Sequence, residues 1–466
     1  MPVWLNIFFA ALLISIILME IAENGHPIRT LAWILILAFL PGIGLVLYFF
    51  FGRDRKNRRM VSVEDMDRLQ ALAEDAFRDR ICTDLPESQK NLITLLETAG
   101  SAQPVTGNGV RVYTDFPEMY SDLLQDLDSA QHHIHFQFFK FEEDEFGRQV
   151  EEILVRKAQE GVEVRLQIDD LANLSRRGFY HRMEQKGVLV KPFFRVRLFL
   201  SSDTNYRNHR KNVVIDGRIG YTGGMNIARR YAIGIHSGIW RDTHIRVTGP
   251  VVAEMQTAFL VDWKFSTKQL LDNPVYYPVV PPSGDLLMQV ATSGPMGEFR
   301  VIMQAVIRIL SESRRYVYIQ TPYFIPNEPI VAALRNAALS GVDVRLMLPL
   351  RGDGNFLVTL ASRSYIQDML YAGVKVFYYE KGFLHSKAIV ADDVVSIGST
   401  NLDIRSFEQD FEINAFIYDP SLASKMRDIF LADEQECHEI TREEWGKRPF
   451  IKRFGESVAR LFSPLL

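Results

Sequence analysis

An internal repeat constrains the fold more than any other feature of the sequence. Three short segments recur in the same order, and they pair HHIHFQFFKF (132–141) with YVYIQTPYFI (316–325), GVEVRLQIDD (161–170) with GVDVRLMLPL (341–350), and GVLVKPFF (187–194) with GVKVFYYE (373–380). The shift is 180 residues from Gly161 to Gly341 and 186 residues from Gly187 to Gly373. A repeat this long is a duplicated domain, because solenoid repeats are only roughly 20–50 residues long.

Each copy alternates short β-rich runs with helical patterns such as RQVEEILVRKAQEG (148–161) and PIVAALRNAALSG (329–341). Alternation of this kind predicts an α/β fold on a largely parallel or mixed sheet. We therefore expect two α/β halves at 109–266 and 283–466. A linker at 52–108 precedes them, and NPVYYPVVPP lies in the connector between them.

Composition argues against several classes of protein. The 466 residues are 47% hydrophobic and 24% charged with a net charge of −4, which is typical of a folded protein and not of a basic nucleic-acid binder. Cys82 and Cys437 lie far apart and outside any metal-ligand spacing, so we expect reduced thiols and neither a disulfide framework nor a zinc site.

Two uncharged apolar runs, Val3 to Met19 and Leu31 to Phe51, precede the repeat. Each is long enough to cross a bilayer core of about 30 Å as a helix, so we expect transmembrane helices at 3–20 and 31–51. A secretory signal peptide is the alternative for the first run. It is disfavoured because no Lys or Arg precedes the run and a second apolar run follows at once.

Basic residues directly follow the second run, at Arg53, Arg55, Lys56, Arg58 and Arg59. Positive flanks stay in the cytoplasm, so the hairpin would be multi-pass, with the N-terminus and the repeat on the cytoplasmic side. The cluster either only fixes this topology or also attracts anionic lipid headgroups. The sequence leaves both readings open.

The chemistry is concentrated in two His-x-Lys-x₄-Asp motifs at equivalent points of the repeat, within 204–230 and 380–406. They comprise His209, Lys211 and Asp216 in the first copy and His385, Lys387 and Asp392 in the second. The corresponding residues are 176 positions apart, and G-[GS]-x-N follows each motif, as Gly224 and Asn226 and as Ser399 and Asn401. One such match is weak evidence, whereas two in register are specific.

Two positions separate each His from its Lys, which places both side chains on one face of a strand. A lysine ammonium repels a divalent cation and attracts a phosphate, so we expect no metal and no cofactor. If the halves pack symmetrically, both pairs meet at one phosphodiester. One His then attacks phosphorus while the other protonates the leaving alkoxide. The lysines, with Asn226 and Asn401, would stabilise the non-bridging oxygens.

The remaining polar residues receive weaker assignments. Asp216 and Asp392 have strand parity opposite to the histidines, so they are interpreted as strand-end anchors. A reactive His needs an acceptor for its other nitrogen, for which Asp242 and Glu412 are candidates, although each is equally compatible with an ordinary surface carboxylate.

Two further stretches invite a functional reading. The HHIH run (132–135) suggests a metal cluster, but a strand with alternating faces is the better interpretation, because the second copy has YVYI there. Residues 448–466 are amphipathic at helical spacing, as in a helix on a membrane surface or one packed on the body, and packing is slightly favoured.

Together these motifs resemble the phospholipase D superfamily. With LPGIGLVLYFFFGR, IQTPYFIP and the final RLFSPLL, nearly the whole chain is similar to bacterial cardiolipin synthases with two transmembrane segments. The resemblance implies an enzyme of the bacterial inner membrane that joins two phosphatidylglycerols into cardiolipin and releases glycerol. It also implies a phosphatidyl-histidine intermediate, with His209 favoured as nucleophile and the six motif residues as the active site.

One departure concerns the first copy, which has GGMN where the family often has GSxN. Gly224 lacks the hydroxyl of Ser399, so a phosphate contact there would come from its backbone N–H. The second copy is also one residue shorter between Asp and Gly, which puts the equivalence of Ser399 in doubt.

Three alternatives remain. A phospholipase D that hydrolyses or transphosphatidylates other phospholipids would use the same motifs. A nuclease is disfavoured by the acidic net charge and the apolar hairpin. A non-enzymatic protein with a decayed site is disfavoured because all six motif residues are present. The oligomeric state is open, and a homo-oligomer is compatible with the sequence.

Overall fold

The computed structural model describes residues 3–22, 27–48, 59–195, 205–236 and 238–465, which fall into two units. The small unit contains α1 (Val3–Ala22), α2 (Pro27–Phe39) and α3 (Pro41–Leu47). Its core is formed by Trp33, Leu37 and Tyr48, and the rings of Trp33 and Tyr48 meet edge to face at 5.5 Å.

In the described residues the second apolar run, expected as one span at 31–51, is divided between two helices. Helix α2 ends at Phe39 and α3 begins at Pro41, because a proline has no N–H to donate to the preceding turn. Residues 49–51 of the predicted span lie outside the described residues. Within the described ranges, the structure contains no helix of the length and apolarity needed to cross a membrane.

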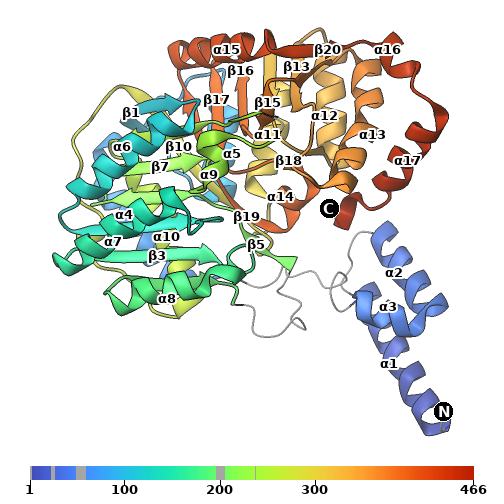
Figure 1. Ribbon diagram of the computed structural model, residues 1–466, viewed down its shortest axis with the longest axis horizontal. Coiled ribbons are helices and arrows are strands. Elements are labelled where there is room, and N and C mark those ends of the chain that lie inside the picture. The colour runs from blue at the N-terminus through green and yellow to red at the C-terminus, as the bar shows by residue number, and fades with distance from the viewer. Residues whose placement is uncertain (1–2, 23–26, 49–58, 196–204, 237, 466) are drawn as a thin grey trace. The chain divides into compact units, whose positions relative to one another are not determined.

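The large unit is built on one mixed sheet of 16 strands in the described residues, with helices on both faces (Figure 1). The first half contributes the order β4-β3-β2-β6-β7-β9-β1, and the second half repeats it as β14-β13-β11-β16-β17-β19-β10. Strands β1 and β10 pair antiparallel in the middle, with Val105 opposite Met288. This arrangement confirms the predicted duplicated α/β fold.

The bounds of the elements follow this duplication. The first half and the segment before it contain α4 (Val63–Phe77), α5 (Lys90–Gly100), β1 (Val105–Tyr113), α6 (Phe116–Ser129), β2 (His133–Phe138), α7 (Glu145–Gln159), β3 (Glu163–Asp169), α8 (Arg177–Gln185), β4 (Leu189–Phe193), β5 (Arg207–Asn208), β6 (Asn212–Ile215), β7 (Ile219–Gly223), α9 (Arg229–Ile233), β8 (Ile239–Arg241), β9 (His244–Thr248) and α10 (Val252–Thr267).

The second half contains β10 (Leu286–Ser293), α11 (Val301–Glu312), β11 (Tyr316–Gln320), β12 (Phe324–Ile325), α12 (Glu328–Leu339), β13 (Asp343–Pro349), α13 (Phe356–Ala372), β14 (Lys375–Tyr379), β15 (Gly382–Leu384), β16 (Ala388–Ala391), β17 (Val394–Gly398), β18 (Leu402–Asp403), α14 (Ile404–Glu408), β19 (Asp410–Tyr418), α15 (Pro420–Glu434), β20 (Cys437–Ile440), α16 (Arg442–Gly446) and α17 (Phe450–Arg460). Short 3₁₀ turns lie at Arg78–Arg80, Leu174–Arg176, Pro274–Tyr276 and, as η6, Ser463–Leu465.

Three parallel strands joined by helices form the outer part of each half, and an antiparallel hairpin that follows the His-x-Lys pair packs beside them. Every residue of β2 and of β11 is buried, as expected for strands covered on both faces. Asparagine and aspartate caps begin the crossover helices: Asp144 accepts two backbone N–H groups of α7, and Asn327 accepts one of α12.

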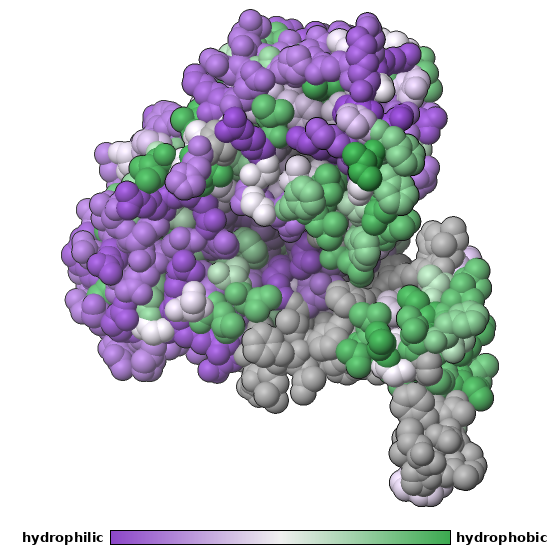
Figure 2. Space-filling view, turned by 45° about the vertical axis from the view of Figure 1, so that its right-hand side comes forward, coloured by the Kyte–Doolittle hydropathy of each residue, from purple (hydrophilic) through white to green (hydrophobic). Residues whose placement is uncertain are grey.

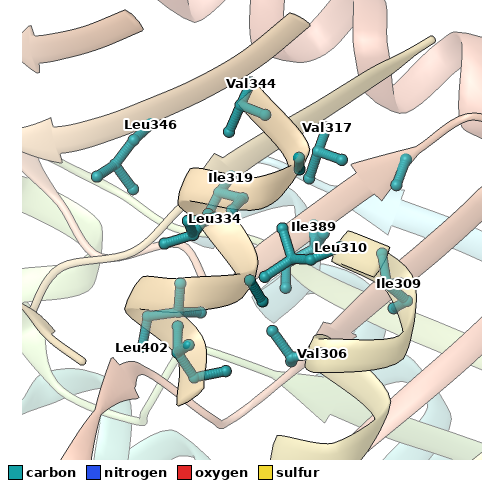
Figure 3. Close-up of a cluster of buried hydrophobic side chains, with 14 of the residues drawn as sticks. Val306, Ile309, Leu310, Val317, Ile319, Leu334, Val344, Leu346, Ile389 and Leu402 are labelled. Carbon is teal, nitrogen blue, oxygen red and sulfur yellow. The ribbon is translucent and has the colours of Figure 1, made fainter. Parts of the chain in front are cut away.

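Helices α4, α10 and α15 cover one face of the sheet across both halves. On the other face, α6, α7 and α8 pack over the first half and α5, α11, α12 and α13 over the second. Figure 3 shows the second-half cluster, in which Val306, Ile309 and Leu310 of α11 meet Val317 and Ile319 of β11. Residues 52–108, expected as a linker, therefore supply two helices to the core, α4 and α5.

Truncation of this core tests the packing. Leu346 in β13 is fully buried in the cluster of Figure 3, so Leu346→Ala should cost about 2–5 kcal/mol of unfolding free energy and lower the thermal midpoint. Leu339→Ala, at a position 67% exposed, is the matched control and should leave the midpoint nearly unchanged. Equal losses in scanning fluorimetry would contradict this packing.

Candidate active site

Strand pairing between the halves positions the two motif histidines. The backbone N–H of His209 donates to the carbonyl of Phe411 at 3.0 Å, because β5 runs beside the start of β19. The N–H of His385 donates to the carbonyl of Arg241 at 2.7 Å, because β15 pairs with β8. Each histidine is thus held by a strand of the opposite half.

A buried carboxylate of the opposite half contacts each imidazole. His209 Nδ1 lies 3.0 Å and 3.2 Å from the two carboxylate oxygens of Glu412, and His385 Nδ1 lies 2.6 Å from Asp242 Oδ2. Both carboxylates are fully buried. If each Nδ1 carries the hydrogen, Nε2 is left with its lone pair and is the atom available for reaction. The two candidate acceptors named from the sequence are therefore both in contact, but across the halves.

The motif lysines lie beside these imidazoles and are buried. Lys211 Nζ donates to the carbonyl of His209 at 2.6 Å, and Lys387 Nζ donates to the carbonyl of His385 and lies 2.9 Å from its Nδ1. Burial lowers the pKa of Lys211 to about 7 and that of Lys387 to about 8. Two positive charges are therefore concentrated in a desolvated site, where they attract an anion strongly.

Burial and the lysines keep both imidazoles neutral. The pKa of His209 is lowered to about 4 by desolvation and by Lys211, and that of His385 is lowered well below its usual value by desolvation and by Lys387. Burial also raises the pKa of Asp242 to about 6. For Glu412 burial acts in the same direction, but the hydrogen bonds with His209 and Ser399 and the positive charge of Lys211 outweigh it and lower the pKa of Glu412.

A phosphate contact at Gly224 would have to come from its backbone N–H, which already has an acceptor within the protein. That N–H donates to the carbonyl of Thr243 at 2.8 Å, and a Cβ at Gly224 would lie 1.9 Å from Asp242 Oδ1. Glycine is therefore needed to make room for the carboxylate.

Ser399 takes the corresponding place in the second half. Its N–H donates to the carbonyl of Ile413 at 2.9 Å, and its hydroxyl donates to Glu412. Thr243 directly follows Asp242, and Ile413 directly follows Glu412. Gly224 and Ser399 are therefore equivalent positions, although the second motif is one residue shorter. Ser399 thus orients a carboxylate, and its hydroxyl is not directed to a phosphate.

Asp216 and Asp392 lie at the far ends of their strands, in tight turns with positive φ of 53° and 48°. Asp216 accepts the N–H groups of Gln131, His132 and His133 at 2.8 Å, and Asp392 accepts those of residues 314–316. These bonds tie each hairpin to the strand beside it, which agrees with the interpretation of both aspartates as anchors.

Both histidines line one cavity of about 670 Å³. The two ends of this cavity differ. The residues near His209 are Phe139, Arg207 and Asp410. At the other end, the rings of Tyr231 and Trp240 lie 5.8 Å and 5.1 Å from the His385 ring, measured between ring centres. The sequence did not indicate these wall residues, because they lie outside the motifs and differ between the copies. The remaining residues of interest in the wall are Lys140, Arg230, Tyr323, Asp353, Asp403, Arg405 and Leu465.

The two asparagines also line this cavity. Asn226 accepts the N–H of Lys140 at 3.0 Å and donates to the Tyr231 hydroxyl at 2.5 Å, so only one hydrogen of its amide remains for a ligand. Asn401 Oδ1 is buried and makes no hydrogen bond to the described residues.

The HHIH run contributes to the core, as the alternative to a metal cluster predicted. His133 and His135 lie on β2, are fully buried and contact the side-chain amide of Gln256 at 3.0 Å and 2.7 Å. The described residues contain no group of three His, Cys, Asp or Glu side chains suited to hold a metal ion.

Two buried imidazoles, each with a lysine and a carboxylate, meet in one cavity of a duplicated α/β fold, an arrangement that defines a site of the phospholipase D type. A family model described as "Cardiolipin synthase, PLD-like domain" matches residues 123–263 and 306–434. A second, described as "Phospholipase_D-nuclease N-terminal", matches residues 7–53. The chain belongs to the cardiolipin synthase family of phospholipase-D-like proteins.

Relatives match over nearly the full length. The chain is 39% identical to a cardiolipin synthase of Oceanobacillus iheyensis, over 98% of this chain and 97% of that one. It is 38% identical to the major cardiolipin synthase ClsA of Bacillus subtilis, over 99% and 98%. A crystal structure of phosphatidylserine synthase from Haemophilus influenzae aligns with 82% of this chain and over its own full length, with a TM-score of 0.61. At 13% sequence identity, this is a likeness of fold alone.

A pair of substitutions tests the Gly224 and Ser399 assignments. Gly224→Ser should displace the Asp242 carboxylate from His385, leave buried polar atoms unpaired and cost roughly 1–3 kcal/mol of unfolding free energy. Ser399→Gly removes one hydroxyl without a clash and should cost less. Denaturant unfolding measures both, and a Gly224→Ser protein as stable as the unsubstituted one would show that the carboxylate does not occupy this space.

Proposed function

We propose that the chain is a cardiolipin synthase, which transfers a phosphatidyl group from one phosphatidylglycerol to another and releases glycerol. The observation that carries the proposal is the convergence of two histidines on one cavity. Each has a buried lysine beside it, and each imidazole is held by a carboxylate of the other half. The full-length relationship to cardiolipin synthases supports the same reaction. We assign the halves to 109–266 and 283–466.

In the first step, His209 Nε2 attacks phosphorus and the bond from phosphorus to the glycerol oxygen breaks. His385, protonated in the enzyme–substrate complex, gives its proton to the leaving glycerol oxygen. Burial disfavours that protonated form in the free site, but the bound phosphodiester anion and the adjacent Asp242 both favour it. The product of this step is a phosphatidyl-histidine and free glycerol.

In the second step, His385 takes the proton from a hydroxyl of a second phosphatidylglycerol, and the oxygen of that hydroxyl attacks phosphorus. The bond from His209 to phosphorus then breaks, which yields cardiolipin and restores His209. Lys211 and Lys387, with Asn226 and Asn401, face the non-bridging oxygens and stabilise their charge in both steps. Asp216 and Asp392 act only through the fold, as anchors. No step requires a metal or a cofactor.

A polyol headgroup fits the acceptor-rich part of the cavity wall. Asn401, Asp403 and Asp410 line it. Asn401 Oδ1 is buried without a hydrogen-bond donor in the described residues, and Asp410 Oδ1 is ion-paired with Arg405 at 3.4 Å. The hydroxyls of a glycerol headgroup are donors that would satisfy such atoms. This supports phosphatidylglycerol over a nucleic-acid substrate.

The lipid substrate and the N-terminal sequence support a place in the bacterial inner membrane. The apolar segments at 3–20 and 31–51 would anchor the chain there as a hairpin, and the basic residues that follow would keep the large unit in the cytoplasm. A homo-oligomer stays compatible with the sequence.

Purified full-length protein given phosphatidylglycerol should form cardiolipin and glycerol in equal amounts, as measured by mass spectrometry. His209→Ala and His385→Ala should each reduce this turnover by at least roughly 10³-fold, because each removes a group that reacts in both steps. His181→Ala is the matched control, since that imidazole is exposed on α8, and it should retain full activity. Phosphatidic acid as the sole product would instead establish a hydrolysing phospholipase D.

The pH dependence follows from the buried charges. Below about pH 6 Asp242 gains a proton and no longer holds His385, and above about pH 7 to 8 Lys211 and then Lys387 lose the charge that binds phosphate. The free-enzyme profile of kcat/KM should therefore be bell-shaped, with its maximum between these limbs. A profile that keeps rising to about pH 9 would contradict a role for cationic lysines.

A further inference from the structure

The C-terminal elements expose an apolar face. On α17, Phe450, Ile451 and Phe454 are 70%, 74% and 55% exposed, and the next turns add Val458 and Leu461. Positions 450, 451, 454, 458 and 461 fall on one side of a helix with 3.6 residues per turn. Figure 2 shows apolar side chains gathered on this face of the large unit.

The other side of the same helix is fixed to the body by polar groups. Glu456 is buried and accepts a bidentate pair from Arg448 at 2.7 Å and 2.8 Å, and Ala459 packs in the core. Arg460 pairs with Asp368 of α13 at 3.1 Å and lies over the Tyr365 ring. Helix α17 is therefore held with its apolar stripe outward, the reverse of a surface helix that packs by its apolar side.

The apolar face continues to the catalytic cavity. Phe356 and Leu357, at the start of α13, are 74% and 38% exposed, and the next residue, Val358, lines the cavity. At the chain's end Phe462 and Leu465 are 44% and 46% exposed, and Leu465 also lines the cavity. An apolar surface therefore leads from α17 to the site where the phosphodiester would react.

Basic residues accompany the stripe. Lys452 and Arg453 are exposed on α17, one on either side of the apolar stripe. An apolar stripe bordered by Lys and Arg is the pattern of a helix that lies in the headgroup region of an anionic bilayer, where burial of apolar side chains and attraction to lipid charge act together.

We propose that α17, η6 and the start of α13 form a membrane-docking face, which rests on the anionic bilayer surface and opens the catalytic cavity directly to lipid. The proposal rests on the proposed function, because a lipid substrate has to reach His209 and His385 from the bilayer. All residues of the docking face belong to the large unit. It lets the phosphate of a lipid enter the cavity while the acyl chains stay against Leu465 and the stripe.

Site-specific fluorescence tests the docking face directly. In the full chain with Cys82→Ser and Cys437→Ser, a polarity-sensitive nitrobenzoxadiazole label is placed at Phe454→Cys, or at Glu184→Cys on α8 as the exposed control. The protein is reconstituted into vesicles of phosphatidylcholine and phosphatidylserine. The emission maximum of the label at 454 should shift to shorter wavelength, and brominated lipids should quench its fluorescence. The emission of the label at 184 should show neither effect.

Two outcomes of this experiment would overturn the proposal. A label at 454 as water-exposed as the one at 184 would mean that the stripe does not touch lipid. A label that is shielded from water but not quenched by brominated lipid would mean that a second copy of the chain covers the stripe.

An activity measurement separates lipid access from catalysis. The triple variant Phe450→Ser, Ile451→Ser, Phe454→Ser should lose roughly ten-fold or more in kcat/KM on phosphatidylglycerol vesicles, because burial of these apolar side chains in lipid drives docking. On monomeric dihexanoyl-phosphatidylglycerol it should keep the activity of the unsubstituted protein. Leu339→Ser, at an exposed apolar position of α12, is the control and should change neither rate.

Equal activity of the triple variant on vesicles would contradict the docking face, and equal loss on both substrates would assign the stripe to folding. If the unsubstituted protein converts neither substrate, the proposed function fails. The fluorescence result would still decide whether the stripe enters the bilayer.

Discussion

The contacts between each motif histidine and a carboxylate of the opposite half are the interactions on which the site depends. A carboxylate buried as completely as Asp242 or Glu412 is costly unless it is paired, and each is paired with an imidazole that belongs to the other copy of the repeat. Neither half can therefore form its own complete site. The antiparallel pairing of β1 with β10 joins the two copies, and in this arrangement both histidine–carboxylate contacts form.

The two halves solve the same packing problem with different residues. In the first half the short Asp242 leaves no space for a side chain at position 224, so glycine stands there. In the second half the longer Glu412 leaves room for the Ser399 hydroxyl, which donates to it. One histidine thus receives a single carboxylate oxygen and the other contacts two. His385 also lies beside aromatic side chains, whereas His209 lies beside charged ones. The two histidines of the duplicated site therefore have different chemical surroundings.

Local patterns predicted much of this arrangement. The repeat indicated two α/β halves, the His-x-Lys spacing placed both side chains together, and strand parity separated Asp216 and Asp392 from the histidines. Asp242 and Glu412 were named as candidates, but their crossing between halves depends on tertiary pairing of β5 with β19 and of β15 with β8, which no local pattern encodes. The wall residues were missed for the same reason. The helix break at Pro41 also has a local cause, because proline lacks the N–H that a continuous helix needs.

The central claim is that the two histidines act in sequence on one phosphodiester, and an activated substrate tests it most directly. A phosphatidyl ester of p-nitrophenol needs no proton for its leaving group, so His385→Ala should release about one equivalent of nitrophenolate and retain the phosphatidyl group on His209. His209→Ala should release none in the same time. Rapid quench with mass spectrometry of the peptide that contains position 209 measures both. The absence of a His209 adduct in His385→Ala, or steady turnover by that variant, would contradict the account.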